Sequence, residues 1–163
     1  MRVTDVRIGH GFDAHPLLAG RPCVLGGVTI PSDSGPLGHS DGDVVLHALA
    51  DALLGAAAAG DLGTVFGTDR PEWRDAPGEA LVRHVRELTD HPPIRNVDVT
   101  ILALRPKVAE FREAMRTNIA ALLGTEPARV SVKASSGNGL TDFGRGDGVA
   151  ATVLVLVEEV AAA

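Results

Sequence analysis

The chain has 163 residues with 15 Lys+Arg against 21 Asp+Glu, a net charge of −6, and an ordinary 45% of hydrophobic residues, which together indicate one globular domain over residues 1–163. The acidic balance and the scarcity of aromatic residues (four Phe, one Trp, no Tyr) argue against a nucleic-acid partner. A single cysteine, Cys23, excludes an internal disulfide, and the longest apolar stretch, residues 149–157, is too short for a membrane span, so we expect a cytoplasmic protein with no membrane partner.

The first forty residues are expected to contain two strands separated by a loop. Residues 6–8 are β-rich, and so are residues 23–30, although a Gly-Gly pair weakens the second strand. Residues 9–20 between them carry Gly, Asp, His and Pro, which predicts an irregular loop. Residues 31–42 are rich in Gly and Pro and predict turns.

The first strong helix is predicted from about residue 43 to residue 59. Ser40 can cap its N-terminus, with Asp43 three residues later in a capping-box arrangement. Gly60 suits the position just after the helix, where a left-handed conformation is needed.

Helices and strands alternate through the rest of the chain. Apolar periodicity predicts helices over residues 78–89 and 108–122 and strands over residues 97–104, 130–133 and 149–157, with a glycine-rich loop over residues 137–148. The fold class is therefore α/β (α+β), a single domain with a mixed β-sheet and three main helices packed on it.

Three N- and O-donor residues form a candidate metal site. In an extended chain Asp13 and His15 point to the same side, and His47 lies on the predicted first helix. Such a set suits a catalytic zinc with one open position. Spacing alone also allows, and even favours, surface histidines that cap loops, and it does not say why His10 or His39 should not be the ligand.

Two other motifs are weaker. Residues 38–42 fit the G-x-S-x-G pattern of a hydrolase nucleophile elbow around Ser40, but no core strand precedes them. Residues 9–14 resemble a dinucleotide fingerprint, but Pro16 and the absence of a helical period after it remove the helix that would hold a pyrophosphate.

Two segments offer groups that suit phosphate. Pro106 and Lys107 open the predicted third helix and put a cation beside free N–H groups. Residues 133–136, Lys-Ala-Ser-Ser, end a strand and supply hydroxyl groups at the mouth of the glycine-rich loop. Each segment taken alone is also compatible with ordinary solvated loop residues.

These pieces, in this order, resemble the 2-C-methyl-D-erythritol 2,4-cyclodiphosphate synthase family of isoprenoid biosynthesis by the non-mevalonate pathway. The resemblance covers nearly the whole chain. It rests on residues 8–15, 37–43, 47–49, 51–56, 60–63, 96–100, 106–107, 132–134 and 144–146.

The resemblance implies a homotrimer with active sites between adjacent subunits, and it assigns the site residues. It implies zinc ligands Asp13, His15 and His47, and transition-state stabilisation by His39 and Ser136. The methylerythritol and phosphate end of the substrate would be bound by Asp13, His15, His39, Ser40, Asp61, Gly63, Phe66 and Asp69. The cytidine diphosphate part would be bound by residues of the neighbouring subunit, namely Ala103, Pro106, Lys107, Val108, Ala134, Ser135 and Ser136. Asn138 and Arg145 are also expected among the substrate-binding residues, with the trimer axis as the alternative place for Arg145.

The implied reaction is an intramolecular phosphoryl transfer with loss of CMP, catalysed by a metal-dependent phosphorus–oxygen lyase. A second divalent cation, Mg²⁺ or Mn²⁺, is expected on the diphosphate, where Asn138 stands at the position of the usual acidic ligand. The alternative is a diverged trimeric paralog that binds zinc and a nucleotide or isoprenoid phosphate without turnover. An esterase that uses Ser40 is a distant third.

Overall fold

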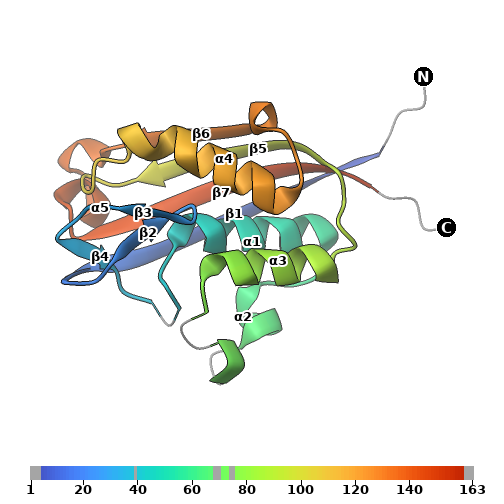
Figure 1. Cartoon of the computed structure of the whole chain (residues 1–163), viewed down its shortest axis with the longest axis horizontal. Helices are drawn as coiled ribbons and strands as arrows, with labels where there is room; N and C mark the ends of the chain where they lie inside the picture. The colour runs from blue at the N-terminus through green and yellow to red at the C-terminus, as the bar shows by residue number, and fades with distance from the viewer. Residues whose placement is uncertain (1–4, 39, 68–70, 74–75, 160–163) are drawn as a thin grey trace.

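The computed structural model describes residues 5–38, 40–67, 71–73 and 76–159. Its centre is a five-stranded mixed sheet in which only the β5–β6 pair is parallel (Figure 1). The strand order is β4 (Ser34–Pro36), β1 (Val6–Ala19), β7 (Gly148–Glu158), β5 (Ile94–Leu102) and β6 (Val130–Ser135).

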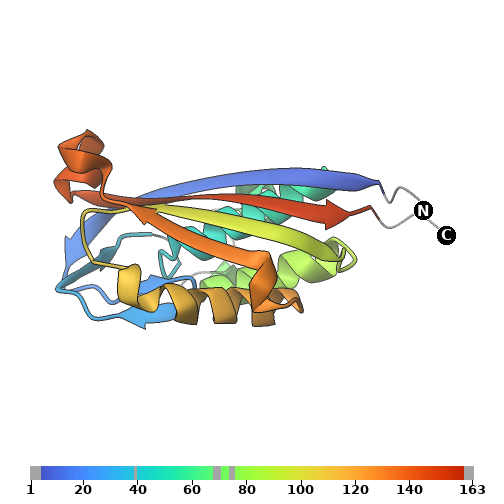
Figure 2. The same cartoon turned by 90° about the horizontal axis from the view of Figure 1, so that it is seen from above.

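Three long helices lie on one face of this sheet, as the sequence predicts. Figure 2 shows them on the lower side of the sheet, whereas the opposite face carries no helix of the described residues along most of its length. They are α1 (Val44–Ala57), α3 (Gly78–Leu88) and α4 (Arg112–Leu123). Two short helices, α2 (Leu62–Phe66) and α5 (Thr141–Arg145), and 3₁₀ turns at Pro71–Trp73, Ala109–Phe111, Pro127–Arg129 and Gly137–Gly139 lie in the connections.

The predicted loop over residues 9–20 is wrong, because β1 runs without interruption from Val6 to Ala19. The strand pairs with β7 from Val6 to Pro16 and then with β4 from Leu17 to Ala19. Its glycines, histidines and proline are weak strand formers, but β1 is paired along its whole length, first with β7 and then with β4, and tertiary pairing overrides local preference.

The glycines of β1 let helix α1 approach the strand closely. A β carbon on Gly9 would come within 1.7 Å of the Ala52 carbonyl oxygen, and one on Gly11 within 1.9 Å of the Ala48 carbonyl oxygen. Side chains alternate along a strand, so residues 13 and 15 project toward the same face as these glycines. The strand therefore delivers Asp13 and His15 to the first turn of α1.

Smaller departures from the sequence prediction occur at turns. Residues 23–30 form a hairpin of β2 (Cys23–Leu25) and β3 (Val28–Ile30), because Gly26 and Gly27 both adopt positive φ between them. Helix α1 ends on Ala58 in the left-handed conformation, two residues before the expected Gly60. Helix α4 begins after a 3₁₀ turn, later than expected, and the expected glycine-rich loop contains α5.

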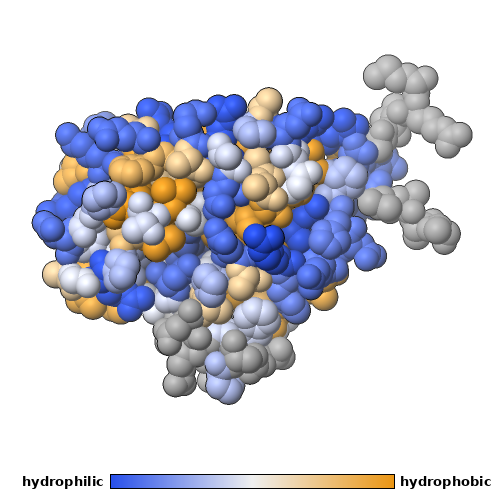
Figure 3. Space-filling model, in the orientation of Figure 1, coloured by the Kyte–Doolittle hydropathy of each residue, from blue (hydrophilic) through white to orange (hydrophobic). Residues whose placement is uncertain are grey.

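The hydrophobic core fills the space between the sheet and the three long helices. Figure 3 views this helical side, where hydrophilic residues form most of the rim and hydrophobic surface is confined to separate patches. Among the helices of the described residues, none has both the length and the apolar character needed to cross a bilayer.

Candidate active site

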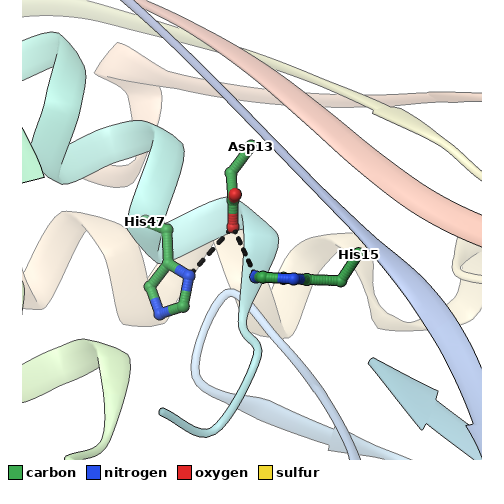
Figure 4. Close-up of side chains that lie close together, drawn as sticks. All are labelled: Asp13, His15 and His47. Atoms are coloured by element: carbon green, nitrogen blue, oxygen red, sulfur yellow. Dashed lines mark hydrogen bonds and ion pairs between the residues drawn. The ribbon is translucent and has the colours of Figure 1, made fainter. Parts of the chain in front are cut away.

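Asp13, His15 and His47 come together between β1 and the first turn of α1 (Figure 4). Oδ2 of Asp13 lies 2.9 Å from Nδ1 of His47 and 3.1 Å from Nε2 of His15. One donor atom from each residue lies within 4.8 Å of the others, and no other such cluster occurs in the part of the chain that the structure describes. This spacing confirms the expected convergence and leaves out His10, which lies on the strand beside Thr152.

The donor set suits a divalent metal. Nε2 of His15 is buried and makes no hydrogen bond, although it faces the Asp13 carboxylate. A buried nitrogen without a hydrogen bond is unfavourable unless something else satisfies it. Two imidazoles and one carboxylate form a ligand set found in catalytic zinc sites, which keep a further position open.

Charge in the cluster is strongly coupled. Burial raises the pKa of Asp13, but contacts with His15 and His47 outweigh it and hold that pKa well below its usual range. Burial lowers the pKa of His47, yet contacts with Asp13 and Asp41 raise it to about 9. The metal-free cluster is therefore stabilised as an ion pair, and a cation that binds there replaces the proton of His47.

Ser40 contacts the cluster instead of capping α1. Its Oγ lies 2.8 Å from Nε2 of His47, on the side of the ring away from Asp13. The expected cap is wrong, because Asp43 is the N-cap residue and accepts hydrogen bonds from the N–H groups of Val45 and Leu46. The strand before Ser40 is the short edge strand β4, which ends at Pro36, so Ser40 does not stand at a direct strand-to-helix turn and a nucleophile elbow has no structural support.

Asp43 ties the start of α1 to the β2–β3 hairpin. Its two carboxylate oxygens accept the N–H groups of Gly26 at 2.8 Å and Gly27 at 2.7 Å in addition to the capping bonds. The side chain is fully buried, which raises its pKa to about 6 against the opposing effect of these N–H donors. Asp43 thereby fixes the helix turn that carries His47.

The residues expected at the methylerythritol end lie on or beside α2. Asp61 is the N-cap of α2 and accepts the Thr64 N–H, and Gly63 is exposed in the first turn. Phe66 is buried, with its ring 4.6 Å from that of Trp73. His39 and Asp69 lie outside the described residues.

The residues expected at the cytidine end gather at the carboxyl ends of β5 and β6. Leu102 pairs with Ser135, and the Ala103 N–H donates to the Ser135 carbonyl, so the two segments lie side by side. The segment after β5 carries Ala103, Pro106, Lys107 and Val108, and the segment that ends β6 carries Ala134, Ser135 and Ser136, followed by Asn138.

These two groups are well separated within one chain. Asp13 pairs with Ala151, Ala151 with Ile101, and Ile101 with Ala134, so Asp13 and Ala134 stand three strands apart in one row of the sheet. At a little under 5 Å per strand spacing this is about 14 Å. One chain brings the metal ligands together but does not bring them to the cytidine-end residues.

The positively charged side chains near the cytidine-end residues differ in whether an acidic residue of the same chain already pairs with them. Arg145 pairs with Asp142 and lies 3.8 Å from an Asp147 oxygen, and Lys133 pairs with Asp98 at 2.6 Å. Lys107 is exposed and has no ion pair within the described ranges.

The sequence predicted Asp43 only as the capping-box partner of Ser40, and it anticipated neither the bonds of Asp43 to the hairpin nor the contact of Asp41 with His47. Asp41 lies 3.6 Å from Nε2 of His47, and Asp43 anchors two segments. Both stand in a Ser-Asp-Gly-Asp run that precedes a strong helix, which is the signal that could have suggested a bonded network rather than a single cap.

Comparison with known proteins identifies the family of the chain. Residues 6–158 match the YgbB family. The chain belongs to that family. The 2-C-methyl-D-erythritol 2,4-cyclodiphosphate synthase of Geobacter sulfurreducens is 50% identical over 156 residues, which cover 94% of this chain and 99% of the relative.

Solved structures of the family share the fold. The bifunctional IspDF of Campylobacter jejuni has a TM-score of 0.91 at 33% identity, covering 96% of this chain and 43% of that longer chain. A 2C-methyl-D-erythritol-2,4-cyclodiphosphate synthase in its CDP-bound form has a TM-score of 0.83 at 35% identity, covering 93% of this chain and 100% of that one. The α+β fold of this chain is thus that of the family.

Proposed function

We propose that this chain is a 2-C-methyl-D-erythritol 2,4-cyclodiphosphate synthase. It converts 4-diphosphocytidyl-2-C-methyl-D-erythritol 2-phosphate to the 2,4-cyclodiphosphate and releases CMP. The observation that carries the proposal is the convergence of Asp13, His15 and His47 in a member of this family. A relative of near-equal length at 50% identity bears the same name.

The reaction forms one P–O bond and breaks another. An oxygen of the 2-phosphate attacks the β-phosphorus of the diphosphate, and the bond from that phosphorus to the oxygen of the CMP phosphate breaks. The nucleophile is already an anion, so the task of the protein is to align two phosphates and spread the developing charge. When bound by Asp13, His15 and His47, a zinc ion supplies positive charge and Lewis acidity for a phosphate oxygen.

The other side chains are proposed to position the substrate. His39 and Ser136 stabilise the transition state, and Ser40, Asp61, Gly63, Phe66 and Asp69 surround the methylerythritol phosphate. Ala103, Pro106, Lys107, Val108, Ala134, Ser135, Asn138 and Arg145 hold the cytidine diphosphate. A relative of 35% identity was solved in its CDP-bound form, which supports a cytidine nucleotide as the ligand. An Mg²⁺ or Mn²⁺ ion on the diphosphate is proposed to join this second set.

The active site is proposed to form between copies of the chain in a cytoplasmic homotrimer, each a single domain over residues 1–163. The separation of about 14 Å between Asp13 and Ala134 supports a site that a neighbouring subunit completes. The outer face of the sheet supports it further, because Ile8 and Phe12 there are 69% and 53% exposed. Large apolar side chains that share one exposed face indicate an interaction surface.

Release of CMP by the purified protein tests the function. The substrate is incubated with the zinc-loaded chain with and without Mn²⁺, and CMP is quantified by chromatography. We expect turnover that disappears in His47→Ala. Absence of CMP from a folded, zinc-loaded protein would refute the proposal, and CDP binding measured by calorimetry in that case would indicate the non-catalytic paralog.

A further inference from the structure

The nitrogen of His47 that faces away from Asp13 has its own polar partners. Nε2 lies 2.8 Å from Oγ of Ser40 and 3.6 Å from Oδ1 of Asp41. The other nitrogen, Nδ1, faces Asp13 at 2.9 Å. The ring is 8% exposed, so solvent does little to orient it. Its orientation is set by these neighbours.

Asp41 is itself held in place by two backbone groups. Oδ2 accepts the N–H of Gly78 at 2.7 Å, and Oδ1 accepts the N–H of Asp43 at 3.0 Å. These two bonds fix the carboxylate and leave Oδ1 facing Nε2 of His47.

The Gly78 bond brings a second helix to the site. The N-cap of α3 is Pro77, which has no side-chain hydrogen bond, so Asp41 satisfies the first N–H of α3 from another segment. Residue 78 must be small for this approach, because a β carbon there would lie 2.9 Å from Cβ of Leu46. Asp41 therefore links the start of α3 to the turn of α1 that carries His47.

The contacts of Ser40 and Asp41 with His47 lie at the ring nitrogen that a metal-binding histidine keeps protonated. A histidine binds a metal through an unprotonated nitrogen, and its other nitrogen then carries the proton and needs an acceptor. Nδ1 of His47 is the nitrogen that faces Asp13 in the donor cluster, so the proton belongs on Nε2. There the Ser40 hydroxyl is within hydrogen-bond distance to accept it, and the Asp41 carboxylate lies 3.6 Å away as a nearby negative charge.

We propose that Asp41, together with Ser40, is a positioning residue that holds His47 in the Nε2-protonated form and in the orientation that presents Nδ1 to a metal. This inference rests on the metal centre of the proposed function. It assigns to Asp41 a role in metal affinity that acts through His47 and involves no contact with the substrate.

Zinc affinity of the full-length chain, measured by competition with a chromophoric chelator, tests the inference. Asp41→Asn keeps one acceptor oxygen, so it loses either the Gly78 bond or the Asp43 bond together with the His47 contact. We expect zinc binding to weaken by about 10- to 100-fold. Nitrogen-15 spectra of the histidines in the zinc-loaded protein should show a shifted or broadened Nε2 signal for His47.

Asp51→Asn is the matched control. Asp51 lies one turn after His47 on α1, and its carboxylate accepts the N–H of Leu62 at 2.8 Å instead of contacting the ring. Asp51→Asn removes one negative charge near the cluster, as Asp41→Asn does, and we expect zinc affinity to change by at most about threefold. Equal losses in both variants, or wild-type affinity in Asp41→Asn, would overturn the inference.

Ser40→Ala covers the case in which Asp41→Asn does not fold. This variant leaves both backbone anchors of Asp41 in place and removes the closest acceptor of Nε2. We expect weaker zinc binding and an altered His47 signal, and unchanged affinity and spectrum would contradict the inference. If the wild-type chain binds no zinc, the metal centre itself fails and the inference falls with it.

Discussion

The α carbon of Gly11 lies so close to the Ala48 carbonyl oxygen that a β carbon on residue 11 would come within 1.9 Å of it. This contact between β1 and α1 determines how near the strand and the helix can lie. Because Asp13 and His15 follow on the same strand and His47 precedes Ala48 on the helix, it also determines whether the three donor atoms meet.

Gly11→Ala is therefore expected to destabilise the fold by about 3 kcal/mol or more, because the clash is with rigid backbone. Urea unfolding measures the loss. Gly55→Ala on the same helix is the control, since its β carbon would meet nothing closer than 3.8 Å, and alanine favours a helix by up to about 1 kcal/mol. Similar unfolding midpoints for the two variants would contradict this account.

The same contact shows what the sequence could and could not predict. The long helices and the strands over residues 97–104, 130–133 and 149–157 carry their own periodicity, so their patterns predict them. The glycines of β1 look like loop residues in the sequence. They are required by the close approach of the α1 backbone, about forty residues later in the chain, and a local sequence pattern does not reveal such a contact. Asp13, His15 and His47 were recoverable as a set only through the family resemblance, since spacing did not exclude His10 or His39.

Asp43 is expected to contribute strongly to the free energy of unfolding, because its two carboxylate oxygens accept hydrogen bonds from N–H groups of α1 and of the β2–β3 hairpin. Asp43→Asn places an amide N–H₂ against at least one of these donors, so we expect a loss of about 2–3 kcal/mol at pH 7.5. Thermal melting checks it. Asp33→Asn, at an exposed position, should melt within a degree or two of the wild type.

Zinc is expected to stabilise the folded chain. A ligand that binds only the folded state at 100 times its dissociation constant adds about 3 kcal/mol, which raises the melting temperature by several degrees. The rise should be reversed by EDTA and absent in His47→Ala. His10→Ala is the control, because His10 contacts Thr152 outside the cluster and the variant should retain the shift.

Alkaline pH is expected to destabilise the fold through Cys23. Burial, aided by Asp43, raises the pKa of this thiol to about 11 from its ordinary 9. The unfolded chain therefore ionises first as pH rises from 9 to 11, and stability falls over that interval by up to about 3 kcal/mol, with no contribution below pH 9.

The effect is isolated by comparing how the free energy of unfolding changes with pH in the wild type and in Cys23→Val. Few other side chains titrate in this range, because the chain has no tyrosine and only two lysines, Lys107 and Lys133. The free energy of unfolding is measured by urea titration at pH 8 and at pH 10.5. We expect the wild type to lose more stability between these two pH values than the variant. Parallel pH profiles would show that the thiol does not titrate as inferred.

The outer face of the sheet, which the helices leave uncovered, is the surface through which we expect copies of the chain to assemble. Its outward residues on β1 include Ile8 and Phe12, and Leu154 of β7 stands beside them, 46% exposed and paired in register with His10. If copies of the chain bury this face, a charge there is costly, because an unpaired carboxylate would lose its water. Phe12→Glu should therefore lower the mass in solution from three times 16.8 kDa to that of one chain and abolish CMP release.

Leu88→Glu is the matched control for this variant. Leu88 is 52% exposed at the end of α3, on the helical side of the molecule, so it lies away from the proposed contact. Light scattering should give this variant the mass of the wild type, with activity retained. A trimer that persists in Phe12→Glu would show that the chain assembles through another surface, and the active site would then have to be completed from elsewhere.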